Sequence, residues 1–135
     1  GGYVIGEHGS SQVLLFSTAV IDGKPVTVSE AIKETIYAEV PLILKRFEEL
    51  QAGRTAGWTC AIGFDAIVRA IVEDSGQIIP CSVVLDGEYG QHGCSMSEPA
   101  ILGREGVKGV KEFRLADDEK EKFKVTTEVL QNAAE

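Results

Sequence analysis

The feature that most limits the fold is a long apolar repeat that begins after Ser29. Apolar side chains recur there every three or four residues, at Ile32, Ile36, Val40, Leu44, Phe47 and Leu50. This is the spacing of one face of an α-helix, and Ser29 is a good N-cap residue. Pro41 removes one backbone hydrogen bond, which predicts a kink near residues 37–40. We therefore expect one long, kinked helix that ends near Gly53.

The rest of the chain alternates between strand-like and helical patterns. A second helix is expected over about residues 59–73, and its apolar residues lie all around the circumference, which indicates a largely buried helix. Apolar, strand-like runs span residues 3–6, 13–20, 77–85, 94–102 and 107–115. Asp22-Gly23 is a turn signal between the second of these runs and residues 24–28. A last helix opens at Asp117, with Phe123, Thr127, Leu130 and Ala134 on one side. These patterns predict an α+β domain with long helices packed on antiparallel strands.

Length, charge and cysteine content exclude several classes of protein. One domain is the default at 135 residues, and the net charge of −8 argues against binding to nucleic acid. No apolar run reaches the roughly 18 residues of a membrane span, and no secretory signal opens the chain. The three cysteines, at irregular spacing, are typical of reduced thiols in a cytoplasmic protein.

The strongest chemical signal is the string Gly6-Glu7-His8-Gly9. It places a histidine on a tight loop after a short strand, where imidazole can give or take a proton near neutral pH. Taken alone, these residues favour an exposed histidine in a surface turn over a catalytic one. His92 and Cys94 lie two residues apart, but paired metal-ligand spacing is lacking, so we expect no metal site.

The flanks of His8 extend this signal. The string YVIGEHGSSQVLLFSTA, from Tyr3 to Ala19, closely resembles the catalytic-histidine segment of the L-lactate/malate dehydrogenase family. Residues 85–90, 99–107 and 117–124 are similar to later elements of that family, in the same order. The resemblance covers nearly all of residues 1–135, but only the C-terminal, substrate-binding half of such an enzyme. It implies the fold of a lactate/malate dehydrogenase C-terminal domain.

The resemblance also implies a reaction. In this family a hydride moves between the nicotinamide ring of NAD and C2 of a small 2-oxo or 2-hydroxy acid. His8 matches the histidine that protonates the carbonyl oxygen and accepts the proton in the reverse direction. An ungapped match places Ala56 at a substrate-lining position and Cys60 on the nicotinamide side. The intact enzyme is expected to be a cytoplasmic homo-oligomer, a dimer or a tetramer.

Several parts of the family's machinery are missing from the chain. It contains no Gly-x-Gly-x-x-Gly string, so NAD is expected to bind mainly to an N-terminal domain that is absent here. The family's substrate-clamping arginine, and the aspartate that orients the histidine, lie upstream of that histidine. Neither residue type occurs among the seven residues before His8. We therefore expect this chain alone to be inactive.

Two questions stay open at the level of sequence. The flanks of His8 favour L-lactate as the substrate, whereas Ala56 favours malate, because lactate enzymes usually carry threonine at that position. Ser10 stands where family members usually have aspartate. Because of that departure, a non-catalytic binding or assembly module stays open as an alternative to an enzyme domain.

Overall fold

The computed structural model describes residues 1–50 and 57–134 and confirms the α+β class. The helices are α1 (Glu30–Glu49), α2 (Gly57–Val72) and α3 (Asp117–Ala133), and the strands are β1 (Tyr3–Ile5), β2 (Val13–Leu15), β3 (Val20–Ile21), β4 (Lys24–Pro25), β5 (Ile78–Asp86), β6 (His92–Gly103) and β7 (Gly106–Val110). The expected helix end at Gly53 and the candidate residue Ala56 lie outside the described residues.

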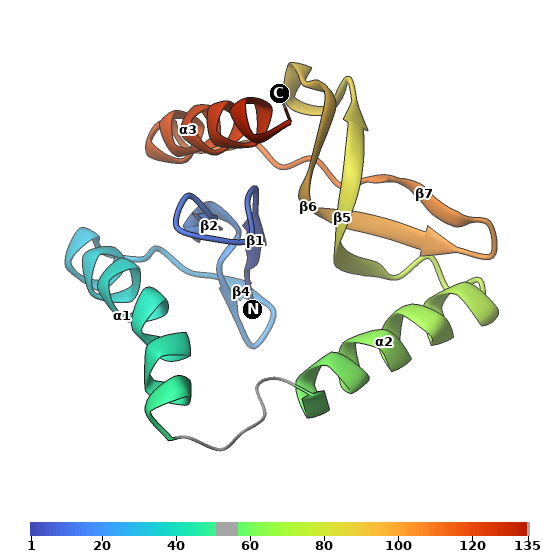
Figure 1. The fold of residues 1–135 in the computed structure, drawn as a ribbon, viewed down its shortest axis with the longest axis horizontal. Helices are drawn as coiled ribbons and strands as arrows, with labels where there is room; N and C mark the ends of the chain where they lie inside the picture. Colours follow the sequence, from blue (N-terminus) through green and yellow to red (C-terminus); the bar gives the residue numbers. More distant parts are fainter. Residues whose placement is uncertain (51–56, 135) are drawn as a thin grey trace.

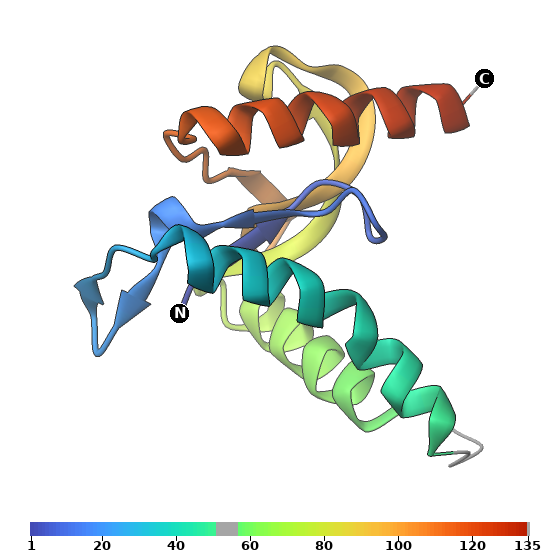
Figure 2. The same cartoon turned by 90° about the vertical axis from the view of Figure 1, so that its left-hand side faces the viewer.

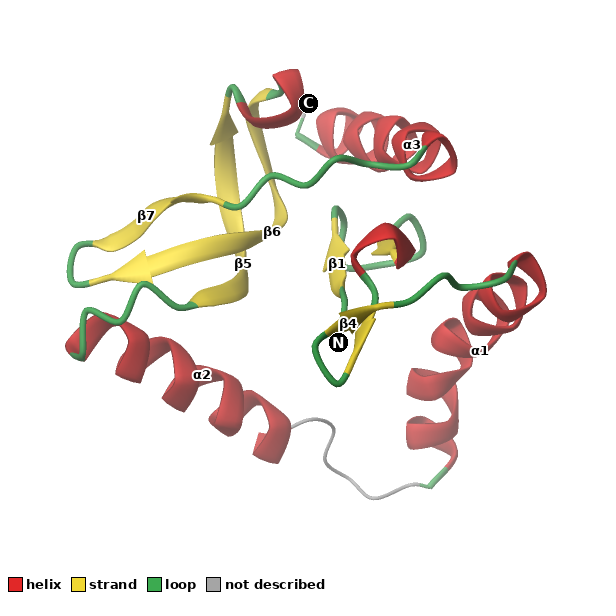
Figure 3. Cartoon of the chain, turned by 180° about the vertical axis from the view of Figure 1, so that it is seen from behind, coloured by secondary structure: helices red, strands yellow, loops and turns green. Residues whose placement is uncertain are grey.

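The described strands form three antiparallel groups. The largest is the sheet β5-β6-β7, and β1 and β2 form a hairpin of their own. Gly6, just after β1, pairs with Ser97 in the middle of β6, which joins the hairpin to the sheet. In Figures 1 and 3 this β1–β2 hairpin lies between the three-stranded sheet and α1. The paired strands of the hairpin therefore stand between the other elements of the domain, and the loop that carries His8 extends from them (Figure 2).

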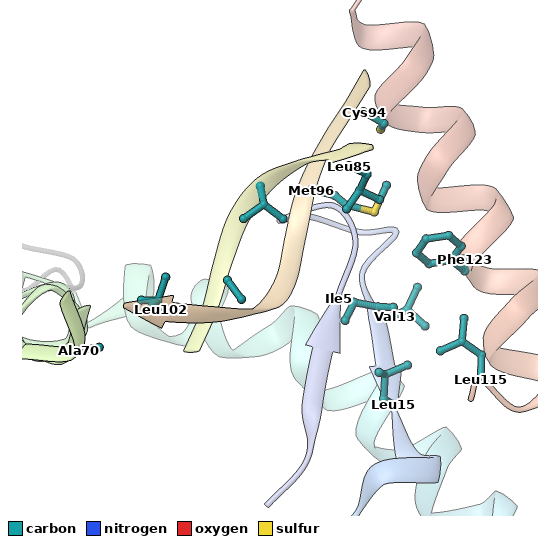
Figure 4. Close-up of a cluster of buried hydrophobic side chains, with 12 residues drawn as sticks. Ile5, Val13, Leu15, Ala70, Leu85, Cys94, Met96, Leu102, Leu115 and Phe123 are labelled. Atoms are coloured by element: carbon teal, nitrogen blue, oxygen red, sulfur yellow. The ribbon is translucent and has the colours of Figure 1, made fainter. Parts of the chain in front are cut away.

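The main core lies where the hairpin, β6 and α3 meet. Figure 4 shows its side chains pointing toward one another: Ile5, Val13, Leu15, Met96, Leu115 and Phe123. A smaller contact joins Ala70 of α2 to the sheet near Leu102. The period-two alternation of β6 buries Met96 but leaves Ser95 exposed, as expected for a sheet with one covered face. The core thus supports the hairpin loop from the side of α3.

The start of α3 is tied to the end of the hairpin by a buried carboxylate. Glu119 is 1% exposed, and it accepts the Ser17 N–H at 2.8 Å, the Ser17 hydroxyl at 2.7 Å and the Ala116 N–H at 2.8 Å. A buried charge is tolerated when it is hydrogen-bonded in this way. Because Glu119 takes the Ser17 N–H, the apolar run 13–20 does not continue as one strand. It passes instead into a short 3₁₀ helix at Phe16–Thr18.

The expected kinked helix and one expected turn are confirmed. α1 runs through Pro41 without ending, and Figures 1 and 2 show the helix change direction along its length. Asp22 and Gly23 have positive φ values of 50° and 74° and form the turn between β3 and β4. The Pro41 bend lets one helix pass the hairpin with its first half and lead away from it with its second.

The prediction that the second helix is largely buried is wrong. α2 buries Ala70, but four large apolar side chains on it are between 57% and 72% exposed: Ile62, Phe64, Val68 and Val72. Periodicity shows that these positions are apolar and says nothing of which surface covers them. The apolar surface of α2 therefore faces solvent in this chain.

No described helix is both long enough and apolar enough to cross a membrane.

The last strand is shorter than the run 107–115 predicts. β7 ends at Val110. The Lys111 N–H still donates to the Pro99 carbonyl at 2.8 Å, but Pro99 has no N–H to return the bond. The Phe113 N–H instead donates to the Tyr89 hydroxyl at 2.9 Å, so the chain leaves the sheet and leads to α3.

One buried acid in the core has no hydrogen-bond partner among the residues that the structure describes. Glu98, on the core side of β6, is 0% exposed, and neither of its carboxylate oxygens is hydrogen-bonded to them. Burial, aided by the charges of Glu88 and Glu112, raises the pKa of Glu98 to about 8. Burial disfavours the charged form of a carboxyl group. Glu98 is therefore expected to be protonated in the folded protein at neutral pH.

This protonation predicts a pH-dependent stability. The folded state holds a proton that the unfolded chain releases near pH 4.5, so the stabilisation is complete below that pH and is lost as pH rises through about 8. Between about pH 5 and pH 9, the free energy of unfolding should fall by on the order of a few kcal/mol. Glu98→Gln should remove most of this fall in urea denaturation, whereas Glu73→Gln, at an exposed glutamate that does not act on the pKa of Glu98, should retain it. Equal falls in Glu98→Gln and the unmodified chain would contradict the assignment.

Candidate active site

His8 lies in the loop between β1 and β2, and its side chain is exposed. The loop begins at Gly6, which has a φ of 91°, a conformation that favours glycine. The Gly6 N–H donates to the Ser97 carbonyl, and the Ser97 N–H donates to the Gly6 carbonyl, both at 2.9 Å. The backbone two residues before His8 is therefore fixed to the central strand of the sheet.

A hydroxyl of α3 holds the next peptide of the same loop. The Glu7 N–H donates to Thr126 Oγ1 at 2.8 Å, and the Thr126 side chain is fully buried. Across the loop, the Ser11 N–H donates to Glu7 Oε2 at 3.0 Å, and the Ser11 hydroxyl donates to the same oxygen. His8 therefore lies between Glu7 and Ser11, which are hydrogen-bonded to each other and, through the Glu7 N–H, to α3.

The Glu7 carboxylate is kept ionised by these bonds. The hydroxyl and the backbone N–H of Ser11 lower the pKa of Glu7 below its ordinary value, and the neighbouring His8 adds a smaller effect. Hydrogen bonds donated to a carboxylate stabilise its charged form. The residue immediately before His8 therefore carries a negative charge that is tied to the loop through Ser11.

A groove of about 260 Å³ lies beside the loop. Its walls come from the loop, α1 and α3, at Ser10, Ser11, Gln12, Tyr37, Val40, Pro41, Lys122 and Val125. The ammonium of Lys122 lies 4.5 Å from the centre of the Tyr37 ring, which is a cation–π contact. His8 is not among the residues that line this groove. The exposed imidazole is therefore open to a ligand that approaches from outside the described chain.

Comparison with known proteins identifies the family of this domain. Residues 2–135 match the family model described as the lactate/malate dehydrogenase, alpha/beta C-terminal domain. The chain belongs to the lactate/malate dehydrogenase family. It is 36% identical over 133 residues to an L-lactate dehydrogenase of Halalkalibacterium halodurans, an alignment that covers 97% of this chain and 42% of that protein.

Other relatives carry the second activity of the family. The chain is 36% identical over 118 residues to a malate dehydrogenase of Halobacterium salinarum, covering 87% of this chain and 38% of the relative. The solved malate dehydrogenase of Aeropyrum pernix superposes with a TM-score of 0.86 at 28% identity, over 98% of this chain and 44% of that structure. The resemblance and the expected fold are confirmed, and the chain spans about two-fifths of the length of these relatives.

The structure places Cys60, another family-derived candidate, apart from His8. Cys60 lies near the N-terminal end of α2 and is exposed, whereas the sequence predicted a buried helix there. Figures 1 and 2 both show that end of α2 well apart from the tip of the β1–β2 hairpin. Ala56 is outside the described residues. Among the described residues, no three His, Cys, Asp or Glu side chains form a group that could hold a metal ion.

Sequence analysis missed the residues that hold the histidine loop. Thr126 and Ser11 were not singled out, because single hydroxyl residues are common on surfaces. One available signal was the pair Thr126-Thr127, which falls three and four residues after Phe123 on the apolar side of a helix. Polar residues on a buried helix face need hydrogen-bond partners, and here the partner of Thr126 is the loop that carries His8.

The close approach of α3 to the loop gives a testable prediction for Gly6. A Cβ at Gly6 would lie 2.7 Å from Thr126 Oγ1, whereas a Cβ at Gly23, which also has a positive φ, would meet nothing within 4 Å. Gly23→Ala should lower the free energy of unfolding by roughly 1–2 kcal/mol from backbone strain alone. Gly6→Ala should cost more, as measured by urea denaturation. Equal losses would show that the contact with Thr126 is unimportant.

Proposed function

We propose that residues 1–135 are the C-terminal, substrate-binding domain of an NAD-dependent L-2-hydroxy-acid dehydrogenase. The observation that carries the proposal is an exposed imidazole, His8, on a loop fixed by hydrogen bonds to β6 and α3. A general acid must be accessible to the substrate and held at a defined position. The loop meets both requirements, and it coincides with the segment that resembles the family's catalytic histidine.

In the proposed reaction, His8 moves one proton. When a 2-oxo acid is reduced, the protonated imidazole gives its N–H proton to the carbonyl oxygen at C2, and the neutral imidazole remains. In the reverse direction, the imidazole takes the proton from the hydroxyl of the 2-hydroxy acid. The nicotinamide of NAD, when bound, supplies or accepts the hydride at C2.

The residues of this chain fit only one side of the NAD site. No Gly-x-Gly-x-x-Gly string is present to hold the pyrophosphate, so most of the NAD contacts are assigned to an N-terminal domain. Cys60, exposed near the start of α2, is proposed to face the nicotinamide side. Ala56, one residue before α2, is proposed to line the substrate site. Both assignments rest on alignment with the family.

We propose L-lactate as the 2-hydroxy acid, with pyruvate as the product. The support is the match of the His8 flanks to lactate enzymes and the 36% identity to the Halalkalibacterium halodurans lactate dehydrogenase. Malate is the second candidate, favoured by Ala56 and by the same identity to a malate dehydrogenase. Steady-state assays of the intact protein with pyruvate and with oxaloacetate separate the two substrates by the ratio of kcat/KM.

The exposed apolar face of α2 supports an assembled form of the protein. Ile62, Phe64, Val68 and Val72 make an apolar surface that monomeric proteins rarely leave open. We propose that the intact enzyme is a cytoplasmic homo-oligomer, a dimer or a tetramer, in which α2 is covered by the N-terminal domain and by a second copy.

The proposed role of His8 predicts a loss of chemistry without a loss of binding. In the intact enzyme, His8→Asn should lower kcat by about 10²–10⁴-fold, because the proton donor is removed. NADH affinity, measured by fluorescence titration, should stay within a factor of about three, since this chain holds little of the NAD site. His92→Asn, at an exposed histidine in β6, is the matched control and should keep the normal rate. A normal rate in His8→Asn would contradict the role of His8 as the proton donor, whereas no turnover in the unmodified intact protein would favour the non-catalytic module.

The apolar face of α2 predicts self-association of the 135-residue chain. Phe64→Lys places a charge on that face and should raise the concentration at which the chain associates in sedimentation velocity. Val84→Lys, at an equally exposed apolar residue of β5, should leave the association unchanged. If both variants behave alike, the contact does not involve α2.

A further inference from the structure

We infer that Thr126 of α3 is a positioning residue for His8, and this inference rests on the proposed function. Thr126 does not act on the substrate itself. Its hydroxyl holds the backbone of the loop at Glu7, immediately before His8, although the two residues are 119 positions apart in the chain. The location of the imidazole therefore depends on how α3 packs against the hairpin.

The direction of each hydrogen bond follows from counting protons. The Thr126 oxygen accepts the Glu7 N–H at 2.8 Å. The Ser11 hydroxyl has one proton, which it donates to the Glu7 carboxylate, a group that cannot donate when ionised. The Ser11 and Thr126 oxygens lie 3.2 Å apart, so Thr126 must be the donor in that pair. Thr126 thus accepts from one side of the loop and donates to the other.

The neighbouring threonine shows that this arrangement is specific to Thr126. Thr127 is also buried, but its hydroxyl donates to the Phe123 carbonyl of the same helix at 2.9 Å. That is the ordinary bond of a threonine inside a helix. The Thr126 hydroxyl points instead to the loop. Two adjacent threonines of similar burial therefore have different partners, which provides a matched control within the chain.

The Thr126 side chain also packs tightly against the start of the loop, at Gly6. Thr126 lies so close to Gly6 that a Cβ there would be 3.2 Å or less from three of its side-chain atoms. On the other side, Gly6 is paired with the backbone of Ser97 through two bonds of 2.9 Å. The loop is therefore held between a strand and a helix. Loss of the Thr126 hydroxyl would leave the half-buried Glu7 N–H without its partner on the helix side.

The test uses the intact enzyme with three variants at the two threonines. Thr126→Val keeps the shape of the side chain and removes the hydroxyl, and we expect kcat to fall by about 10–100-fold from misplacement of His8. The KM for the 2-oxo acid should change by less than about threefold, because Thr126 does not touch the substrate. Thr126→Ser keeps the hydroxyl and should restore most of kcat. Thr127→Val removes the other hydroxyl and should keep the normal kcat.

A second measurement reads the loop directly. Hydrogen exchange with mass spectrometry should show faster exchange of the amides of residues 6–12 in Thr126→Val, and no change there in Thr127→Val. This readout does not depend on turnover. If His8→Asn keeps the normal rate while Thr126→Val still loosens the loop, the proposed function fails and the contact with α3 stands.

Other results would overturn the inference itself. A normal kcat and normal loop exchange in Thr126→Val would show that the hydroxyl does not position the loop. Equal losses in Thr126→Val and Thr127→Val would indicate general damage to α3. If Thr126→Val does not fold, Ser11→Ala serves instead, because it removes the acceptor of the Thr126 proton. It should lower kcat in the same direction by a smaller factor, and a normal rate in Ser11→Ala would then count against the inference.

Discussion

The packing of α3 against the β1–β2 hairpin is the interaction on which the rest of the domain depends. Two polar residues on the buried side of α3 make the contact specific: Glu119 binds Ser17 after β2, and Thr126 binds Glu7 in the loop before it. They are seven residues apart, which is two helical turns, so both face the hairpin. Phe123 lies between them and fills the apolar core. Burial supplies the stabilisation, and the two polar contacts determine where the loop lies.

On the side of α2, the same domain leaves large apolar side chains exposed. The hairpin, β6 and α3 bury their apolar residues against one another, whereas α2 exposes Phe64 and Val68 to solvent. A domain that spans about two-fifths of its relatives has surfaces that the remaining part of such proteins can cover. His8 is also exposed, on a loop that is held in place by contacts from inside the domain.

Much of the fold was predictable because it depends on local patterns. The helix after Ser29, the effect of Pro41 and the turn at Asp22-Gly23 were all confirmed, since each follows from spacing or from backbone chemistry. The burial of α2 and the end of β7 were not. The first depends on which surfaces meet, and the second on Pro99, a residue of another strand that cannot return a backbone hydrogen bond.

By itself, the sequence determined the class of the fold, the place of His8 in a glycine-flanked loop and the family to which these belong. Periodicity, turn chemistry and the string around His8 are all properties of neighbouring residues. Only the tertiary structure decided what holds that loop and which groups are buried without partners. The bond from Glu7 to Thr126 joins residues 119 positions apart, and the pKa of about 8 at Glu98 arises from burial. Such long-range contacts leave no periodic trace in a single sequence, because they depend on how separate elements pack.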